Sequence, residues 1–151
     1  MFTNAIIITA PLVEQKWTEV MKMREILFRG KREDTDEWIY GDLLTSTDIV
    51  NCTEIAENTG MGDRYDVIPE TVGQYTGLTD RTGKKIFEGD ILKLKDYHHE
   101  RIVYVFWGYI GSWFYGGDGY SDEYIFNSSG KEVIGNIYDN PELLGGDEQR
   151  E

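Results

Sequence analysis

Short stretches rich in β-branched and aromatic residues, bounded by turns that contain glycine, most constrain what this chain can fold into. Residues 91–95 (ILKLK) alternate apolar and basic side chains, which is the period-two pattern of a half-buried strand. Residues 101–107 (RIVYVFW) favour a strand that is buried on both faces. Glycine-rich turns at residues 116–119 and 128–130 separate the later stretches at the spacing of small β barrels. The sequence therefore predicts a mostly β fold with little helix.

A hairpin is predicted near the start of this β-rich region. Residues 25–29 form a strand candidate that ends at Gly30, and residues 37–43 form a second one. The acidic stretch between them (KREDTD) supplies the turn. Three further strand candidates follow the RIVYVFW run, at residues 112–115, 124–126 and 133–138.

The turns that precede residues 91–95 depend on glycine and aspartate. Gly83 is expected to supply a positive φ, and Gly89 is expected to permit a tight bend. The carboxylate of Asp90 can then accept hydrogen bonds from neighbouring backbone N–H groups. We expect residues 73–138 to form a small, strongly curved barrel whose core includes Ile91, Val103, Val105 and Ile137.

Length and charge limit the class of protein. A chain of 151 residues is at the common single-domain size and forms one compact unit or two small lobes that share a core. The formal net charge is −13, and residues 31–75 carry eleven acidic and three basic residues, a balance of −8, whereas residues 76–101 balance at +1. An acidic surface repels phosphate, which disfavours general nucleic-acid binding. The charge either keeps the protein soluble or presents an acidic face to a basic partner.

A cytoplasmic location without membrane insertion is expected. The longest apolar run, residues 5–13, is broken by Thr9 and Pro11 and is far shorter than the roughly 20 residues of a membrane helix. It also lacks the basic flank and the cleavage site of a signal peptide. The lone cysteine, Cys52, cannot form an intramolecular disulfide and fits a reducing compartment.

No catalytic, cofactor-binding or metal-binding residues are predicted. His98 and His99 are neighbours in a loop, and neighbours on an extended chain point to opposite sides, so solvated side chains are favoured over a shared metal. Asp118, Asp122 and Glu123 lie in a segment that faintly resembles a calcium loop but lacks its ligand spacing. The sequence has neither a phosphate-binding loop ending in Gly-Lys-Ser or Gly-Lys-Thr nor a Gly-x-Ser-x-Gly elbow. An enzyme is therefore not predicted.

Two sets of side chains are candidates for binding surfaces. An aromatic set could stack bases or grip peptides, but a barrel needs large core residues, so most of the set is expected to be buried. Its members are Tyr104, Trp107, Tyr109, Trp113, Tyr115 and Tyr120. A basic hairpin could contact phosphate. Its members are Lys84, Lys85, Lys93, Lys95 and Arg101.

Three separated segments resemble the YopX family of phage and prophage proteins. They are MREILFRGKREDTDEWIYGDLL at residues 23–44, IPETVGQYTGLTDRTGKKIFEGDILKL at residues 68–94 and EVIGNIYDNPELL at residues 132–144. The positions that carry the likeness are turn formers and strand punctuation, which concern the fold rather than chemistry. They are Gly73, Gly77, Gly83, Gly89, Asp90, Gly135, Asn136 and Pro141.

The resemblance implies an SH3-like barrel and a phage or prophage setting in a bacterial host, but it brings no established activity. We expect an N-terminal extension at residues 1–22, an acidic β lobe at 23–70, the barrel at 71–144 and a polar tail at 145–151. The function favoured is that of a non-enzymatic accessory protein that acts through protein–protein contacts and forms a homo-oligomer. The alternative is a nucleic-acid-directed protein, either a binder through the basic hairpin or an acidic DNA mimic that inhibits a host enzyme.

Residues 1–22 differ in character from the rest. Met23 has the surroundings of a native start, and Met21 is a second candidate, so the extension is either part of the natural protein or the product of an upstream translation start. Residues 6–8 predict an apolar strand, and a short amphipathic helix follows it. The apolar stripe of that helix consists of Leu12, Val13, Trp17, Val20 and Met21. We expect this segment to pack on the family-like region or on a second copy of it.

Overall fold

The computed structural model describes residues 25–46, 52–57, 62–95, 100–108, 111–117, 120–125 and 130–145 of the chain. These residues form antiparallel strands and two single-turn 3-10 helices, so the predicted mostly β fold with little helix is confirmed. Nothing in the described residues is a helix long and apolar enough to cross a membrane. The elements are β1 (Phe28–Lys31), β2 (Trp38–Ser46), β3 (Cys52–Glu57), β4 (Arg64–Asp66), η1 (Pro69–Thr71), β5 (Gly73–Thr79), β6 (Lys85–Phe87), β7 (Asp90–Lys95), β8 (Glu100–Gly108), β9 (Ser112–Gly117), β10 (Tyr120–Tyr124), β11 (Lys131–Asn136) and η2 (Pro141–Leu143).

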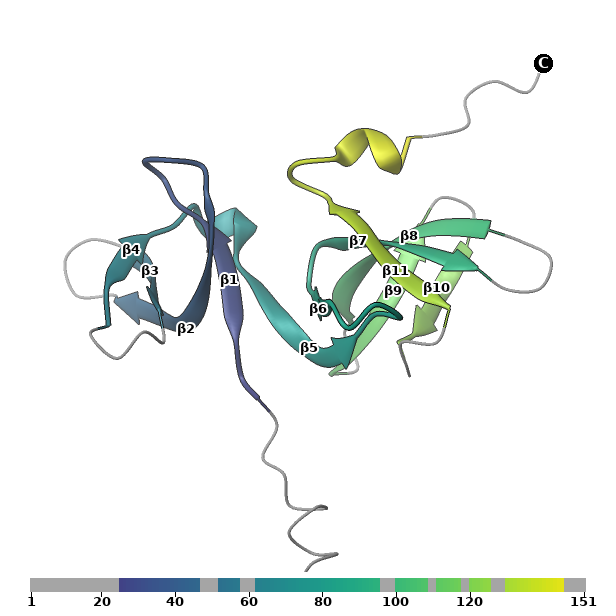
Figure 1. Ribbon diagram of the computed structural model, residues 1–151, viewed down its shortest axis with the longest axis horizontal. Coiled ribbons are helices and arrows are strands. Elements are labelled where there is room, and N and C mark those ends of the chain that lie inside the picture. Colours follow the sequence, from purple (N-terminus) through teal and green to yellow (C-terminus); the bar gives the residue numbers. More distant parts are fainter. Residues whose placement is uncertain are drawn as a thin grey trace, which may run out of the picture.

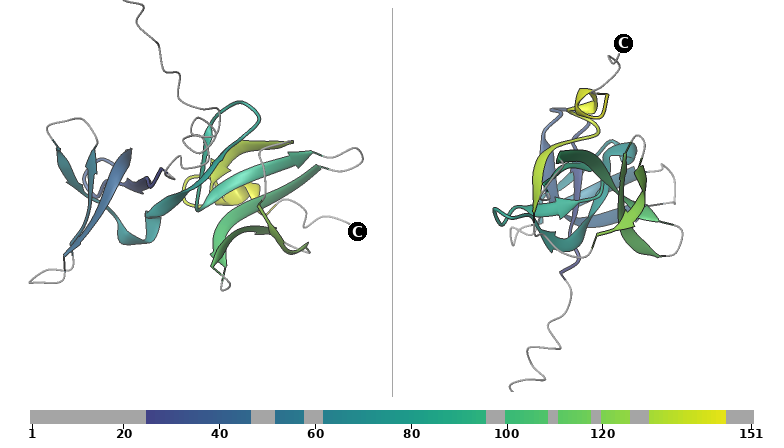
Figure 2. Two further views of the ribbon diagram at one scale, coloured as in Figure 1. Left: turned by 90° about the horizontal axis from the view of Figure 1, so that it is seen from below. Right: turned by 90° about the vertical axis from the view of Figure 1, so that its right-hand side faces the viewer.

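The strands form two sheets, and the molecule has two lobes. The first sheet has the order β4-β3-β2-β1-β5-β6, and the second has the order β10-β9-β8-β7-β11. Figure 1 shows β1 to β4 in one lobe and the second sheet in the other, with β5 passing from the first lobe to the second. Figure 2 shows the same separation from below. The first residues of β5 pair with β1 and the later ones pair with β6, so this strand is the backbone connection between the lobes.

The predicted hairpin is the pair β1 and β2, with Arg29 opposite Tyr40. The prediction that its first strand ends at Gly30 is wrong. β1 continues through Gly30 to Lys31. A Cβ at Gly30 would lie only 3.1 Å from atoms of Ile55 and of Val67, so a larger residue would not fit at this close approach. Glycine here lets the strand approach the core closely rather than turn.

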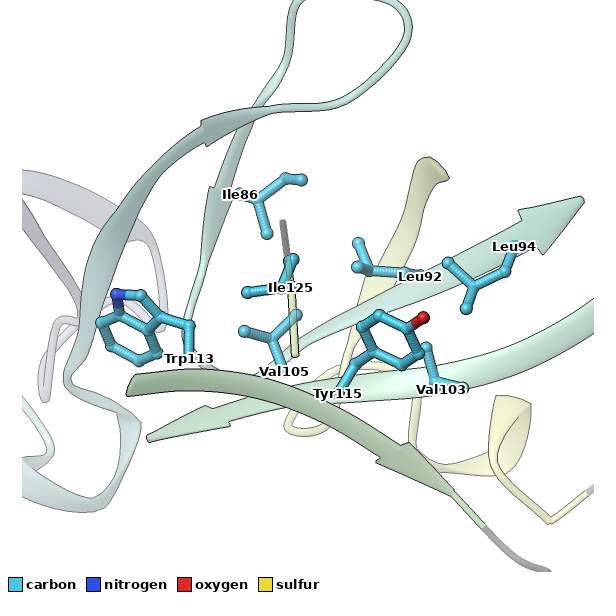
Figure 3. Close-up of a cluster of buried hydrophobic side chains, with 8 residues drawn as sticks. All are labelled: Ile86, Leu92, Leu94, Val103, Val105, Trp113, Tyr115 and Ile125. Atoms are coloured by element: carbon cyan, nitrogen blue, oxygen red, sulfur yellow. The ribbon is translucent and has the colours of Figure 1, made fainter. Parts of the chain in front are cut away.

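Two separate hydrophobic clusters stabilise the lobes. The smaller cluster lies in the first lobe around Ile39, Ile55 and Val67. The larger cluster fills the second lobe, the predicted barrel, where buried side chains from β6, β7, β8 and β9 meet Ile125, as Figure 3 shows. Its buried members are Ile86, Leu92, Leu94, Val103, Val105, Trp113, Tyr115 and Ile125.

The core prediction for the barrel is confirmed at three of four positions. Ile91, Val103 and Val105 are buried. Ile137 is only half-buried, so its assignment to the core is wrong. It follows the last residue of β11 and therefore lies in the turn beyond the sheet.

The expectation that both faces of β8 are buried is also wrong. The inward face carries Val103 and Val105, which are buried, but on the outer face Ile102 is 40% exposed, and Tyr104 and Phe106 are only half-buried. An antiparallel sheet commonly has one face on the core and one face toward water, and β8 follows that pattern. The aromatic residues of β8 led to the prediction that both faces are buried. Residue type alone does not show which side chains are buried.

The glycine turns before β7 have the predicted conformations. Gly83 has φ +91° and Gly89 has φ +80°. The Oδ2 atom of Asp90 accepts a hydrogen bond from the amide of Phe87 at 2.7 Å, as expected for a carboxylate at a strand entry. The turn at Gly89 is also close to Tyr138, because a Cβ on Gly89 would lie 3.1 Å from the Tyr138 ring.

The later strand candidates differ in accuracy. The candidates at 112–115 and 133–138 correspond to β9 and β11 with shifted ends. The candidate at 124–126 is misplaced, because β10 spans Tyr120–Tyr124 and its first residue pairs with Gly117. The strands β3 to β6 carry no strong period-two pattern and were not predicted.

Several predictions concern parts of the chain that lie outside the described residues. These are the strand and helix expected within residues 1–22, the tail beyond residue 145, and the side chains of Cys52, His98, His99, Tyr109, Asp118, Tyr120, Asp122 and Glu123.

Candidate functional site at the lobe junction and on neighbouring surfaces

A buried ion pair joins the two lobes. The Nη1 atom of Arg29, in β1, donates to Oδ1 of Asp90 at 2.6 Å, and Nη2 donates to the carbonyl oxygen of Glu88 at 3.0 Å. Only 7% of the Arg29 side chain and 2% of the Asp90 side chain are exposed. The guanidinium therefore attaches the first lobe to the loop that enters β7 of the barrel.

Burial changes the acid–base behaviour of Asp90. Loss of water around the carboxylate raises the pKa of Asp90 above its ordinary value, although the charge of Arg29 and the amide of Phe87 oppose the change. The Nε atom of Arg29 is buried and has no hydrogen-bond acceptor within the described part of the chain. Such a pair gains little on balance when intact, but the loss of either member leaves an uncompensated charge.

Aromatic rings enclose the same guanidinium. The Cζ atom of Arg29 lies 4.7 Å from the ring centre of Trp38 and 5.1 Å from that of Phe87. Tyr40 and Tyr75 pack against Phe87, with ring centres 5.5 and 5.6 Å away. A cation over an aromatic face is attracted to the ring, more so where water is excluded. The arrangement favours a junction that holds one geometry.

A second carboxylate connects the segment after β11 to the first lobe. Asp139 accepts hydrogen bonds from Nζ of Lys31 at 2.9 Å, from Nε1 of Trp38 at 2.6 Å and from Nδ2 of Asn136 at 2.9 Å. Burial is the largest single influence on the pKa of Asp139 and would raise it. The hydrogen bonds from Asn136, Lys31 and Trp38 together outweigh it and lower the pKa of Asp139 to about 2.

Tyr138 adds two further contacts across the junction. Its hydroxyl donates to the carbonyl oxygen of Glu70, and its ring packs against Trp38 with the ring centres 6.0 Å apart. The charged and polar groups of the junction thus bind one another. Within the described ranges, no group of three or more His, Cys, Asp or Glu residues could hold a metal ion. This geometry attaches the two lobes to each other.

The side chain of Asp80 binds the backbone of β11, an edge strand of the second sheet. Its Oδ1 accepts hydrogen bonds from the amides of Thr82 and Lys84, and its Oδ2 accepts one from the amide of Val133 in the edge strand β11 at 3.0 Å. Burial opposes ionisation here too. The hydrogen bonds from Thr82, Val133 and Lys84 outweigh it and lower the pKa of Asp80 to about 2. The carboxylate therefore occupies a backbone donor that would otherwise be free on an edge strand.

The predicted basic hairpin is divided and accompanied by carboxylates. Lys93 and Lys95 lie 2.8 and 3.6 Å from Glu100. Together with Arg81, which pairs with Glu132, they line a hollow of about 270 Å³. Residue patterns did not place Arg81 there, since it precedes the strand in a turn. The other members lie elsewhere: Lys84 in the turn before β6, Lys85 beside Glu25, and Arg101 6.0 Å from the ring of Tyr115.

The aromatic set is only partly core. Trp113 and Tyr115 are buried in the barrel, as predicted for most of the set. Tyr104 is half-buried, and its ring centre lies 5.6 Å from that of Phe106 on the outer face. Trp107 is exposed, so a core assignment for it is wrong. It lies at the end of β8, beyond the part of the strand that the barrel covers.

Exposed carboxylates gather on the first lobe. Arg32 engages Asp34 at 2.6 Å, and Lys31 lies 3.7 Å from Asp36. The surface nevertheless stays predominantly acidic, because the carboxylates far outnumber the cations. The exposed members are Glu33, Asp34, Asp36, Glu37, Asp42, Asp63, Asp66 and Glu70.

Sequence patterns did not identify Arg29, Trp38 or Asp139 as a group. An arginine within a short apolar strand is a signal for a buried ion pair. It does not name a partner that is 61 residues away in the chain. Only the two-lobed arrangement brings these side chains together.

Comparisons with known proteins agree with this architecture. A family model described as YopX protein matches residues 27–145, which include every residue of the junction. Among solved structures, the chain is similar to the crystal structure of protein EF1440 from Enterococcus faecalis, with a TM-score of 0.53 and 25% sequence identity. That similarity covers 80% of this chain and 98% of the other. No curated protein matches the chain.

Proposed function

This chain belongs to the YopX protein family, and from that premise we propose that it is a non-enzymatic accessory protein that binds other proteins. It acts for a phage or prophage, in the cytoplasm of the bacterial host. The observation that carries the proposal is the exposed acidic surface of the first lobe, where residues 31–75 have a charge balance of −8. Such a surface raises the rate and the specificity of association with a basic partner.

The experiment is affinity capture of host proteins by the full chain, from infected or lysogenic cells, at low and at high salt. Exposed charges are screened beyond about 8 Å at physiological ionic strength, so capture of the specific partner should weaken as salt rises. Replacing Asp63 and Asp66 by Asn should weaken it as well. A matched control, Glu100→Gln with Glu142→Gln, changes the net charge equally but outside the first lobe. The proposal would be contradicted if the amount of captured partner were the same at low and high salt and the same after the Asp63 and Asp66 changes.

Homo-oligomers are part of the same proposal. Sheet edges must be covered, charged or paired, and residues 6–8 are an apolar stretch that is costly to leave in water. We expect one discrete assembly, since homo-oligomers are usually closed and symmetric. Light scattering on the full chain and on a version that starts at Met23 would test this. Equal assembly by both would place the interface within residues 23–151, and a monomeric full chain would refute it.

The nucleic-acid alternative has less support. Glu100 and Glu132 accompany the cations of the hollow near Lys93, which lowers its attraction for phosphate. A mobility-shift assay with short single-stranded and double-stranded DNA at low salt addresses direct binding. We expect no shift, and a shift that disappears in Lys93→Gln would favour the alternative.

A further inference from the structure

Trp107 is an exposed aromatic side chain on a rigid support. Its ring meets the buried Trp113 edge-on, with ring centres 4.7 Å apart and planes at 72°. The two residues are directly opposite each other in the β8–β9 pair. Figure 3 shows Trp113 at one end of the barrel cluster, with its ring beside Val105. Trp107 therefore rests on the core while about half of its own surface faces water.

The described strand residues next to Trp107 are closely packed. A Cβ on Gly108 would lie 2.4 Å from the ring of Phe114, so only glycine fits there. Phe114 in turn stacks on Phe106 on the opposite face, with ring centres 5.8 Å apart. A fixed aromatic side chain loses little conformational freedom on binding, which is why tryptophan is common among the residues that dominate interfaces.

Trp107 lies toward the end of the barrel that is joined to the acidic first lobe. Asp90, which pairs with Arg29 of that lobe, begins β7, and the amide of Gly89 donates to the carbonyl of Val105 in β8. Trp107 is two residues beyond Val105 and therefore lies at the junction end of the barrel. The exposed face of an aromatic ring attracts a cation, and the formal net charge of −13 adds a general attraction for cations.

The first lobe already uses this type of contact twice. Arg29 lies against Trp38 and is paired with Asp90, while Arg32 lies 4.3 Å from the ring centre of Tyr65 and is held by Asp34. In both cases a guanidinium has an aromatic face on one side and a carboxylate at its nitrogens. Trp107 offers the aromatic face without a cation of its own among the ring contacts of the described residues.

We propose that the exposed face of Trp107 receives an arginine side chain from an extended, basic segment of the partner protein. The inference rests on the proposed function and names the chemistry of the partner. Arginine suits the site better than lysine, because its planar guanidinium stacks on aromatic rings and is more weakly hydrated. A nucleic-acid base would also stack on tryptophan, but its phosphates would meet the acidic lobe.

The test uses the full chain and two short peptides of equal charge, one alternating arginine with alanine and one alternating lysine with alanine. Titration calorimetry at physiological salt measures both affinities. We expect the arginine peptide to bind on the order of fivefold more tightly than the lysine peptide. Trp107→Ala should abolish this preference and leave the weak, charge-dependent binding of both peptides. Ile102→Ala, a matched change at an exposed apolar position of the same strand, should retain the preference.

Three outcomes would overturn the inference: equal binding of the two peptides by the unchanged protein, a preference that survives Trp107→Ala, or a preference that Ile102→Ala removes as well. An NMR titration of the unchanged protein gives a second measurement that needs no variant. The indole N–H signal of Trp107 should move with the arginine peptide far more than with the lysine peptide. If capture of the host partner responds to Asp63→Asn with Asp66→Asn but not to Trp107→Ala, the proposed function stands and this site does not.

Discussion

Replacing Asp90 by Asn should test the importance of the buried ion pair at the junction. Asn has nearly the same size and its side-chain oxygen can still accept the bond from the amide of Phe87, so packing is kept while the charge is lost. Arg29 would then be a buried cation whose remaining acceptor is the carbonyl oxygen of Glu88. Breaking one side of a buried pair costs about 3–5 kcal/mol. The rings of Trp38 and Phe87 still face the guanidinium, so we expect the lower end, about 3 kcal/mol.

The opposite change, Arg29→Met, should have a different pH dependence. Burial already raises the pKa of Asp90, and without Arg29 the carboxyl would take up a proton still more readily. The native state then binds more protons than the unfolded state between the ordinary aspartate pKa and the raised one. Stability therefore falls as pH rises through that window, and Arg29→Met should be less harmful near pH 5 than near pH 8. Asp90→Asn removes the titrating group and should lack this difference.

Urea denaturation followed by tryptophan fluorescence measures both effects. The double change Arg29→Met with Asp90→Asn should cost less than the sum of the single changes, because neither charge remains. Asp34→Asn is the control, since the Arg32–Asp34 pair has the same 2.6 Å separation but the Asp34 side chain is 64% exposed. Solvent screens that pair, so little loss is expected. Equal losses for Asp90→Asn and Asp34→Asn would refute the argument from burial.

Three further outcomes are expected. Val105→Ala should lower the free energy of unfolding by about 1–3 kcal/mol, measured by urea denaturation, since the side chain is buried in the barrel core. A loss of only a few tenths of a kcal/mol would contradict the assignment of Val105 to the core. The low pKa of Asp80 should stabilise the protein above the ordinary aspartate value of 3.8, with the contribution, roughly 2 kcal/mol, lost as pH falls toward about 2. Acid titration of Asp80→Asn should lack that loss, and an unchanged acid profile would contradict the assignment. Gly89→Ala should cost about 1–2 kcal/mol because of its positive φ, and an unchanged melting temperature would show that the turn relaxes freely.

The local features of the fold could be predicted because each depends on neighbours in the chain. Gly83 and Gly89 have positive φ because turns at those positions require it, and Asp90 accepts an amide three residues back. The alternation in residues 91–95 correctly indicated a strand whose Leu92 and Leu94 are buried, although Ile91 on the other face is buried as well. Gly30 shows the limit of such reasoning. The same residue type signals a turn or a close approach of two elements, and the choice depends on Ile55 and Val67, which are distant in sequence.

The composition and local pattern of this chain decide its β class, its turns and its uneven charge, because these properties depend on residue type and short-range geometry. Tertiary structure alone decides which charges are buried and which rings remain in water. Arg29 and Arg32 lie three residues apart, yet the first is enclosed between two lobes and the second remains near the surface. Trp107 and Trp113 are both aromatic strand residues, yet one is exposed and the other is core. The difference arises because burial and electrostatic pairing depend on which distant segments come together when β5 joins the two lobes.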